Sequence, residues 1–444
     1  MQSFVKGNTP ENSPFKTSDS PKSYTVRQTC SFCDSANVFP VMDFGHVALA
    51  GGFLRQDQFE AEEKFPLRLS FCANCFAVQI MDVVPAETLF KNYFYFSSAI
   101  GTLREHFEDY ATEVVSRFLP EPAKSTVVEI GCNDGILLRP FADQEVGKLI
   151  GVDPATNVVN TINDTRITVV NDFFSEQTAE DIKQTHGEAD LIVANNVFAH
   201  IPEINDLTSG IEKLLGQDGI FIFEVHYLGK VLHGLQYDMV YHEHLYYYSL
   251  LALSNHFKRF GMLVFDVKAI PIHAGSMRYY VCKKDSKHAS QVSSRVEKLK
   301  QAELAAGLNK AETYAKFAQS VDSRRDSLLD LLEKIKAKGK SIGGYGASGR
   351  ANTIIQYTGI TDRHVDYVID DAPAKQGFYT PGSHLLIRDN SVLTSEPPDY
   401  LLNFAWGYLS EIAEKCRPYF DNGGRMILPL PDVRVLFHPN ETEI

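Results

Sequence analysis

The sequence predicts an α/β protein in which a small cysteine-bearing domain precedes two Rossmann-like units. Two close pairs of cysteines lie in a short, turn-rich region between residues 24 and 85. From about 86 to 285, short β-branched runs alternate with helical patterns, which is typical of a parallel sheet covered by helices. The same alternation starts again near residue 340, after a long helical stretch. A chain of 444 residues is long enough for several such domains.

The amino-acid composition and the predicted secondary structure change at four positions, which divide the chain into five segments. The first segment is polar and rich in Ser, Pro and Asn, without an apolar core of signal-peptide length, so we expect a disordered lead-in. The fourth is rich in Ala, Leu, Lys and Glu and has a single glycine, Gly307, between residues 290 and 338, which favours a connecting helix pair. The segments are a lead-in (1–23), a zinc-binding domain (24–85), a core (86–285), a helical connector (286–339) and a C-terminal Rossmann-like domain (340–444).

Charge and hydropathy exclude two classes of protein. The formal net charge is −13 and the chain has no concentrated block of Lys and Arg, so we do not expect a nucleic-acid partner. No apolar run approaches the roughly 18 residues of a membrane span. We therefore expect a cytoplasmic protein that does not associate with membranes.

The cysteine pairs predict a structural zinc site. Cys30 and Cys33 form one CxxC pair, and Cys72 and Cys75 form another. The two-residue spacing lets both thiolates of a pair reach one ion, and four thiolates close a tetrahedral site without leaving a position for water. The alternatives are four unrelated buried thiols or a redox CxxC, but two such pairs in a reducing compartment favour zinc.

A glycine-bearing turn after a predicted strand, residues 126–130, marks a cofactor site. The sequence VVEIGCNDG holds Glu129, Gly131, Asn133 and Gly135, and its glycines permit a ligand to approach the backbone closely. The next predicted strand ends in Asp153, whose carboxylate can accept from both hydroxyls of a ribose. A glycine turn can also serve packing alone, so this motif by itself is weak evidence.

Two further groups of candidate cofactor-binding residues follow at predicted strand ends. The spacing of the first turn is not GxGxxG and looks like the first motif of class I methyltransferases, which bind S-adenosylmethionine. Asp172 and Phe173 fall where such enzymes hold adenine, and Asn195 and Asn196 fall beneath the methionine portion. Four such groups in this order predict a class I (Rossmann-like) methyltransferase core with S-adenosylmethionine as cofactor.

A dense group of proton-transfer side chains follows the next predicted strand, residues 220–225. Glu224 and His226 lie at its end, and Tyr241, Glu243 and His244 follow in the sequence YHEH. Methylation of carbon requires a carbanion or enolate, and therefore a base with a pKa near neutrality and donors for the developing oxyanion. The group is alternatively a metal site, although HEH lacks the HExxH spacing, or a solvated polar loop.

These motifs together resemble the nucleotide-sugar C-methyltransferases of the deoxysugar pathways, such as the 3-C-methyltransferases that make branched antibiotic sugars. The resemblance runs from the paired cysteines through EIGCNDG and YHEH to GYGASGRANT, which is nearly the whole chain. It implies a dTDP-linked 4-keto-6-deoxy sugar as substrate, enclosed by the three domains. The sequence GYGASGRANT departs from a simple dinucleotide fingerprint, so we expect the C-terminal Rossmann-like domain to carry sugar nucleotide and not NAD.

The resemblance assigns roles to individual residues. The Tyr-x-Glu-His motif of the family falls on Tyr241, Glu243 and His244, with the histidine as the base that removes the proton next to the ketone. A supporting histidine falls on His200, and a supporting tyrosine falls on Tyr95, with Tyr93 as the alternative. The residues expected beside the substrate are Glu224, His226, His273, Ser276 and Arg278, and those expected at the pyrophosphate are Gly346, Ser348, Gly349, Arg350 and Asn352.

Three other functions remain open from the sequence. An O- or N-methyltransferase of a small metabolite needs no enolate, and a catalytically silent protein would keep the zinc and the sugar-nucleotide site without binding S-adenosylmethionine. A dehydrogenase is supported only by the C-terminal glycine-rich loop. The sequence leaves open which carbon is methylated, which nucleotide is carried and which substituents the sugar has. A monomer or weak oligomer is the expected state.

Overall fold

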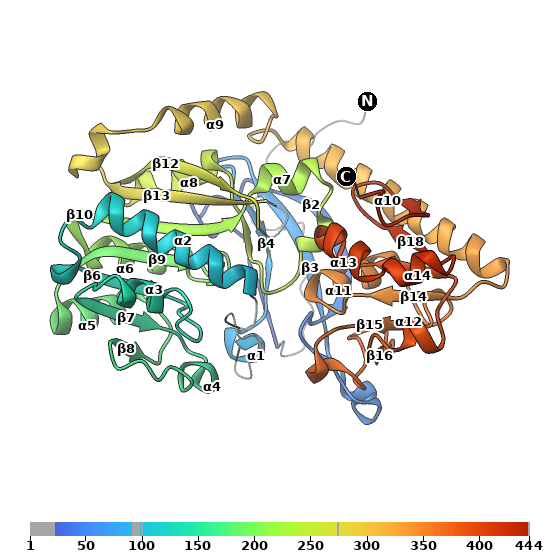
Figure 1. Cartoon of the computed structure of the whole chain (residues 1–444). Coiled ribbons are helices and arrows are strands. Elements are labelled where there is room, and N and C mark those ends of the chain that lie inside the picture. The colour runs from blue at the N-terminus through green and yellow to red at the C-terminus, as the bar shows by residue number, and fades with distance from the viewer. Residues whose placement is uncertain (1–22, 91–97, 99–100, 273–274, 443–444) are drawn as a thin grey trace.

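A computed structural model describes residues 23–90, 98, 101–272 and 275–442 of the protein. The described chain forms a four-stranded, a seven-stranded and a six-stranded sheet, with one further two-stranded pair. The blue strands of the N-terminal domain stand between the green central domain and the red C-terminal domain (Figure 1). The predicted fold class, a small N-terminal domain followed by two Rossmann-like units, is confirmed. No helix in this part of the chain has both the length and the apolar character needed to cross a bilayer.

The N-terminal sheet is antiparallel, and its outermost strand comes from a distant part of the chain. Its order is β11-β4-β3-β2, in which β11 (Tyr246–Tyr247) follows the YHEH sequence directly. The N-terminal elements are β1 (Thr25–Val26), β2 (Val38–Ala48), η1 (Gln56–Ala61), β3 (Lys64–Cys72), β4 (Val78–Ile80) and β5 (Asp82–Val83), and α1 (Ala86–Phe90) follows them.

The central sheet has the order β12-β13-β10-β9-β6-β7-β8. Five of its strands are parallel, as the sequence predicts: β6 (Thr126–Ile130), β7 (Lys148–Val152), β8 (Ile167–Val170), β9 (Ala189–Asn195) and β10 (Leu215–His226). The sheet is mixed at one edge, where β13 (Ser276–Lys283) runs antiparallel to both of its neighbours, β10 and β12 (Met262–Ile270). The connection over 271–275 is too short for a crossover helix, so the two strands form a hairpin.

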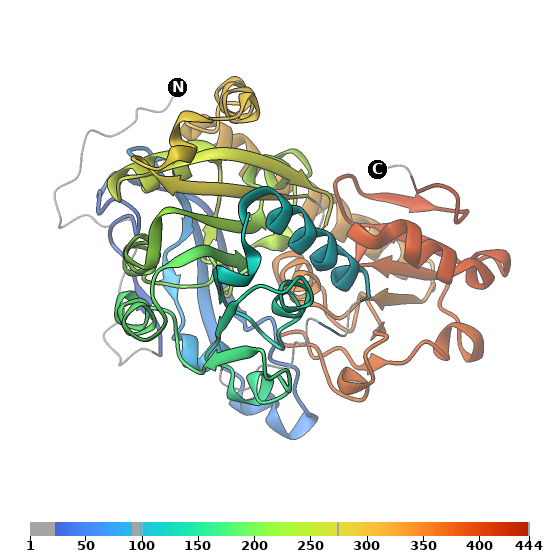
Figure 2. The same cartoon turned by 60° about the vertical axis from the view of Figure 1, so that its left-hand side comes forward.

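Helices cover both faces of the central sheet because alternate strand residues are buried on opposite sides. Val127 and Leu191 pack with α2 and α3, whereas Val128 and Ile192 pack with α5, α6 and α8. Figure 2 shows α2 crossing the front of this sheet. The helical elements are α2 (Gly101–Phe118), η3 (Pro122–Lys124), α3 (Leu138–Asp143), α4 (Thr156–Val159), α5 (Glu176–His186), α6 (Ile204–Leu214), α7 (Leu228–His233), η4 (Tyr237–Met239) and α8 (Leu250–Arg259).

The predicted connecting helix pair is present. After η5 (Lys287–Ser290), α9 (Ser294–Ala305) is capped by Ser293, whose hydroxyl accepts from the backbone N–H of Arg295. The break before α10 (Ala311–Ala337) contains Gly307 at a φ of +73°. Its positive φ ends the first helix and turns the chain.

The C-terminal sheet has the order β16-β15-β14-β17-β18-β19 and is parallel except for the last pair. Its glycine-rich turn leads from the first strand into α11, whose N-cap Ser348 accepts from Ala351 N–H. The elements are β14 (Ile342–Tyr345), α11 (Gly349–Thr358), β15 (Tyr367–Ile369), η6 (Pro373–Lys375), β16 (Ile387–Arg388), α12 (Val392–Ser395), β17 (Tyr400–Asn403), η7 (Trp406–Tyr408), α13 (Leu409–Lys415), α14 (Arg417–Asp421), β18 (Arg425–Leu428) and β19 (Arg434–Leu436).

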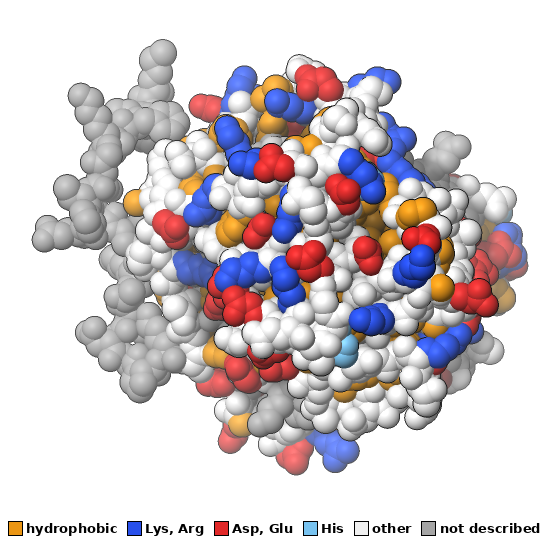
Figure 3. Space-filling model, turned by 90° about the vertical axis from the view of Figure 1, so that its left-hand side faces the viewer, with side chains coloured by type: hydrophobic (Ala, Val, Ile, Leu, Met, Phe, Trp, Pro, Cys, Tyr) orange, Lys and Arg blue, Asp and Glu red, His pale blue; other side chains and the backbone are white. Residues whose placement is uncertain are grey.

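Acidic and basic side chains are interleaved on the face of the molecule that Figure 3 presents. Asp and Glu lie next to Lys and Arg over this face, with apolar side chains scattered between them. Such a mixed surface offers no single-sign field to a highly charged partner on this side.

Candidate active site

The four paired cysteines converge in the N-terminal domain. Cys30 Sγ lies 3.5 Å from Cys75 Sγ, and Cys33 Sγ lies 3.7 Å from Cys72 Sγ. All four sulfur atoms lie within 4.8 Å of one another. This separation suits four thiolates around one tetrahedral zinc ion, so the donor set fits the predicted metal.

Both CxxC turns have the same backbone. In the first, Asp34 N–H donates to Cys30 O at 2.9 Å, and Asp34 has a φ of +60°. In the second, Phe76 N–H donates to Cys72 O at 2.8 Å, and Phe76 has a φ of +67°. The hydrogen bond closes each turn, so both cysteines of a pair face the same point.

The thiols need a cation in order to ionise together. Hydrogen bonds from Cys30 and Cys75 lower the pKa of Cys72, whereas hydrogen bonding to neighbouring thiols raises the pKa of Cys30 and of Cys75. Four thiolates this close together would repel one another without a cation between them. A zinc ion offsets the repulsion between the thiolates because it stabilises each of them.

The glycine turn after β6 is fixed by backbone conformation and by a close contact. Gly131 and Gly135 have φ values of +69° and +78°, and Asn133 between them has +49°. A Cβ atom added to Gly131 would lie 2.2 Å from Cγ2 of Val197. No side chain fits there, so the turn after β6 and the loop after β9 pack directly together.

Replacing Gly131 by Ala is expected to weaken binding of S-adenosylmethionine at least tenfold and to lower the melting temperature, because the new methyl group displaces Val197. Gly261→Ala is the matched control, since Gly261 has a similar φ of +66° but nothing within 4 Å of the added atom. Calorimetric titration and thermal unfolding measure both effects. Equal behaviour of the two variants would show that the contact with Val197 is unimportant.

Buried polar atoms without partners surround the same turn. Within the described residues, Glu129 Oε2, Asp134 Oδ1, Asn196 Oδ1 and both amide atoms of Asn195 lack a hydrogen bond. Burial raises the pKa of Glu129 well above its usual range, and the charges of Asp153 and Asp134 add to this effect. A cationic ligand with N–H donors would satisfy these atoms, and S-adenosylmethionine carries both a sulfonium and an ammonium group.

The residues predicted to bind the ribose and the adenine lie at the ends of the neighbouring strands β7 and β8. Asp153 accepts from the backbone N–H of Asn133 at 3.0 Å and of Ala155 at 2.9 Å, which ties its carboxylate to the glycine turn. Asp172 and Phe173 follow β8 and are exposed. Both therefore remain accessible to a ligand.

His244 is held in one tautomer. Its Nδ1 lies 2.9 Å from Met239 O, and a carbonyl oxygen only accepts, so Nδ1 carries a proton. In the neutral ring Nε2 then keeps its lone pair, which accepts from the Tyr241 hydroxyl at 2.8 Å. The geometry presents Nε2 as a base.

Two further histidines from separate strand ends surround this ring. The ring centroids of His200, after β9, and His226, at the end of β10, lie 5.1 Å and 5.0 Å from that of His244. Burial lowers the pKa of His200 to about 4, so this ring is neutral at physiological pH. Burial also raises the pKa of Glu243 to about 7, close to the range in which an acid–base group works best.

The loop that bears His244 is clamped between the N- and C-terminal domains. On one side, β11 pairs with β4, and His242 Nε2 donates to Pro66 O at 3.0 Å. On the other side, Arg350 Nε donates to Asp238 at 2.8 Å, and Thr353 Oγ1 donates to Val240 O at 2.9 Å. His242 and His244 therefore contact different partners, which does not support HEH as a metal site.

Comparison with known proteins adds to this geometry. Residues 30–90 match a zinc binding domain family, 103–265 a methyltransferase domain family, and 271–431 the family described as C-methyltransferase C-terminal domain. The chain is 32% identical to the C-methyltransferase NovU of Streptomyces niveus, over 92% of this chain and 96% of NovU. The chain belongs to this C-methyltransferase family.

Among solved structures, this chain is similar to that of a magnesium protoporphyrin IX methyltransferase from Synechocystis with bound S-adenosylmethionine. The two are 14% identical with a TM-score of 0.31, and the match covers 40% of this chain and 79% of that one. The family matches confirm the predicted methyltransferase core and zinc-binding domain.

Two predicted substrate residues of the C-methyltransferase lie in its interior. Glu224 is fully buried and Arg278 is 2% exposed, and Arg278 Nε donates to Glu224 at 2.6 Å. Ser276 is also buried, opposite His226 in the β10–β13 ladder. Contact of Glu224 and Arg278 with substrate stays a prediction, and in this structure they bind each other.

The predicted pyrophosphate residues of the C-methyltransferase also have partners within the chain. Arg350 pairs with Asp238, and Asn352 Nδ2 donates to Ala48 O in β2 at 3.0 Å. Gly349 lies against Tyr241, since an added Cβ would be 3.5 Å from that ring. Gly346 has a φ of +93°, which suits a close backbone approach. Tyr95, its alternative Tyr93 and His273 lie outside the described residues.

Sequence reasoning missed three residues that the structure brings to this site. Asp238 and Thr353 hold the His244 loop, and His106 of α2 contacts Glu224. Thr353 is the last residue of the GYGASGRANT sequence but was not singled out there, and neither Asp238 nor His106 belongs to a recognisable motif. The sequence marks Asp238 only as an acidic residue three positions before YHEH.

Proposed function

We propose that this C-methyltransferase methylates the carbon next to the ketone of a nucleotide-linked 4-keto-6-deoxy sugar, with carbon 3 as the expected position and dTDP as the expected nucleotide. The supporting observation is the His244 ring, whose Nε2 is kept as an acceptor by the Nδ1 contact with Met239 O. The ring lies among His200, His226 and Tyr241 on the loop beside β9 and β10. The sugar assignment draws on the YHEH, HAGSMR and GYGASGRANT sequences.

The proposed reaction begins with proton transfer to His244. Nε2 takes the proton from the carbon alpha to the ketone, and the C–H electron pair forms the enolate. Once Nε2 is protonated it no longer accepts from the Tyr241 hydroxyl, which can then turn to donate to the enolate oxygen. S-adenosylmethionine, when bound, supplies the electrophilic methyl group for this carbon. His244 then returns its proton to solvent.

Mass spectrometry with a panel of 4-keto nucleotide sugars tests this function. We expect one sugar nucleotide to gain the mass of a single CH2 group in the presence of S-adenosylmethionine. With a 13C-labelled methyl donor, the product is expected to show a methyl carbon coupled to a ring carbon. A label found on oxygen or nitrogen, or no gain with any keto sugar, would contradict the proposal.

Location and assembly complete the proposal. We infer that the enzyme acts in the cytoplasm, where nucleotide sugars and S-adenosylmethionine are available together, as a monomer or weak oligomer. Sedimentation velocity across a range of protein concentrations measures the oligomeric state.

A further inference from the structure

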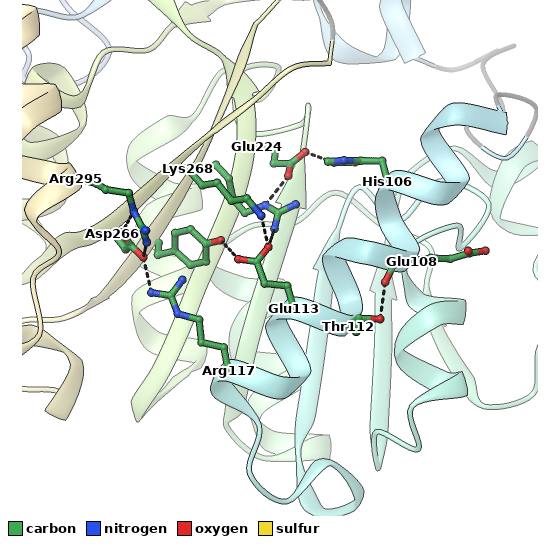
Figure 4. Close-up of polar contacts among 11 residues, drawn as sticks. His106, Glu108, Thr112, Glu113, Arg117, Glu224, Asp266, Lys268 and Arg295 are labelled. Carbon is green, nitrogen blue, oxygen red and sulfur yellow. Dashed lines mark hydrogen bonds and ion pairs between the residues drawn. The ribbon is translucent and has the colours of Figure 1, made fainter.

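A buried ion network connects α2 to the end of β10. Glu224 lies between two basic groups, with His106 Nε2 at 2.8 Å and Arg278 Nε at 2.6 Å (Figure 4). The Arg278 guanidinium also lies 3.7 Å from the Tyr110 ring centroid and 3.2 Å from Glu113. Every charge in this network is therefore matched by an opposite one.

Glu224 is ionised in this network. Burial alone would raise its pKa, but the hydrogen bond from His106 and the charge of Arg278 hold the pKa below its usual range. A carboxylate only accepts, so His106 Nε2 carries a proton and donates. To donate to the carboxylate of a ligand as well, the ring would carry a proton on Nδ1 and lie as an imidazolium between two anions.

The network adjoins the part of the cofactor site where the methionine portion is expected. Glu224 is the register partner of Asn195 in β9, and its carbonyl accepts from Asn196 N–H at 2.8 Å. Just before α2, Ser98 N–H donates to Asp134 of the glycine turn at 3.2 Å. The start of α2 and the unpartnered polar atoms of Glu129 and Asn195 therefore lie around the same region.

His106 is the member of the Glu224 pairings that a ligand can reach. Its side chain is 14% exposed, whereas those of Glu224 and Arg278 are 0% and 2% exposed. Within the described residues, no hydrogen bond of His106 Nδ1 is found. The carboxyl groups of Glu129 and Asp134, on the glycine-turn side of the cofactor site, suit the ammonium group of an amino acid better than its carboxylate.

We propose that His106, oriented by Glu224, binds the carboxylate of the methionine portion of S-adenosylmethionine. Acidic residues on the glycine-turn side receive the ammonium group, and the imidazole on the α2 side receives the carboxylate. The inference concerns the cofactor alone and does not depend on the sugar assignment.

The test compares two ligands that differ by one carboxylate. His106→Gln keeps an amide donor for Glu224 but removes the imidazole, and Glu108→Gln, on the outer side of the same helix (Figure 4), is the matched control. Calorimetry gives the affinity of each variant for S-adenosylmethionine and for its decarboxylated form, which keeps the sulfonium and ammonium groups.

We expect His106→Gln to weaken binding of S-adenosylmethionine roughly tenfold or more and to leave binding of the decarboxylated form unchanged. His106→Arg, which restores a cation, is expected to recover part of the affinity. An equal loss for both ligands would mean a structural role only. Unchanged affinity for S-adenosylmethionine would overturn the proposal directly.

Discussion

Replacing His244 by Gln is expected to lower the turnover number by about 100-fold to 10,000-fold, the range for loss of a general base. The glutamine amide can keep a contact with Met239 O but offers no basic nitrogen to the substrate. Binding of S-adenosylmethionine is expected to stay within about twofold of the wild type, because the glycine turn at Gly131 is untouched. Steady-state kinetics and calorimetry on the same preparation measure the two quantities.

His242→Gln is the matched control for this variant. The two histidines are separated by one residue, but His242 Nε2 donates to Pro66 O and a glutamine amide can do the same. We expect this variant to keep most of the turnover. If His244→Gln retained full turnover with its ligands bound, the base assignment would be refuted.

The second large effect is expected on removal of zinc. Cys72→Ser removes one thiolate from the four-sulfur cluster, and binding of structural zinc contributes on the order of 10 kcal/mol in small zinc domains. We expect loss of bound zinc, a melting transition lower by many degrees, and loss of activity. Elemental analysis, thermal unfolding and turnover follow the three changes.

Activity is expected to fall with the metal because the cluster supports the His244 loop. β4 begins at Val78, shortly after Cys75, and pairs with β11 at Tyr246 and Tyr247. Leu245 O also accepts from Ile80 N–H at 2.8 Å. Cys416→Ala is the control, since Cys416 is buried in the C-terminal domain outside the cluster. A Cys72→Ser protein with full activity would show that the loop does not need this support.

Features fixed by short-range spacing were predictable from the sequence. The Thr126–Ile130 strand and the glycine turn that follows it depend on contiguous residues, and the structure has the strand with the predicted bounds. Each CxxC turn is also closed by neighbouring residues, so the sequence was sufficient to indicate the four-cysteine cluster.

Features that depend on distant pairings were not predictable. The β11–β4 pairing joins Tyr246 to Gln79, and nothing in the short sequence around either residue indicates it. Arg350 and Asp238 are separated by 112 positions, and His106 and Glu224 by 118. An isolated sequence shows the charge of such residues but not which opposite charge is buried against it.

Burial also changed the interpretation of some motif residues. A conspicuous arginine such as Arg278 or Arg350 favours an anionic ligand when only the sequence is known. In the structure, carboxylates of the same chain occupy both guanidinium groups. The sequence alone does not show these internal partners, and contact of either arginine with substrate stays a prediction.

Hydrogen exchange at the substrate carbon tests the central claim most directly. The 4-keto sugar nucleotide that is methylated is incubated in deuterium oxide with enzyme and S-adenosylhomocysteine, so that no methyl group is available. If His244 makes the carbon nucleophilic, NMR should show that the wild-type protein replaces the hydrogen alpha to the ketone with deuterium, and that His244→Gln does so no faster than solvent alone. Methylation by a wild-type enzyme that gives no such exchange, or equal exchange by both proteins, would contradict a histidine-generated enolate.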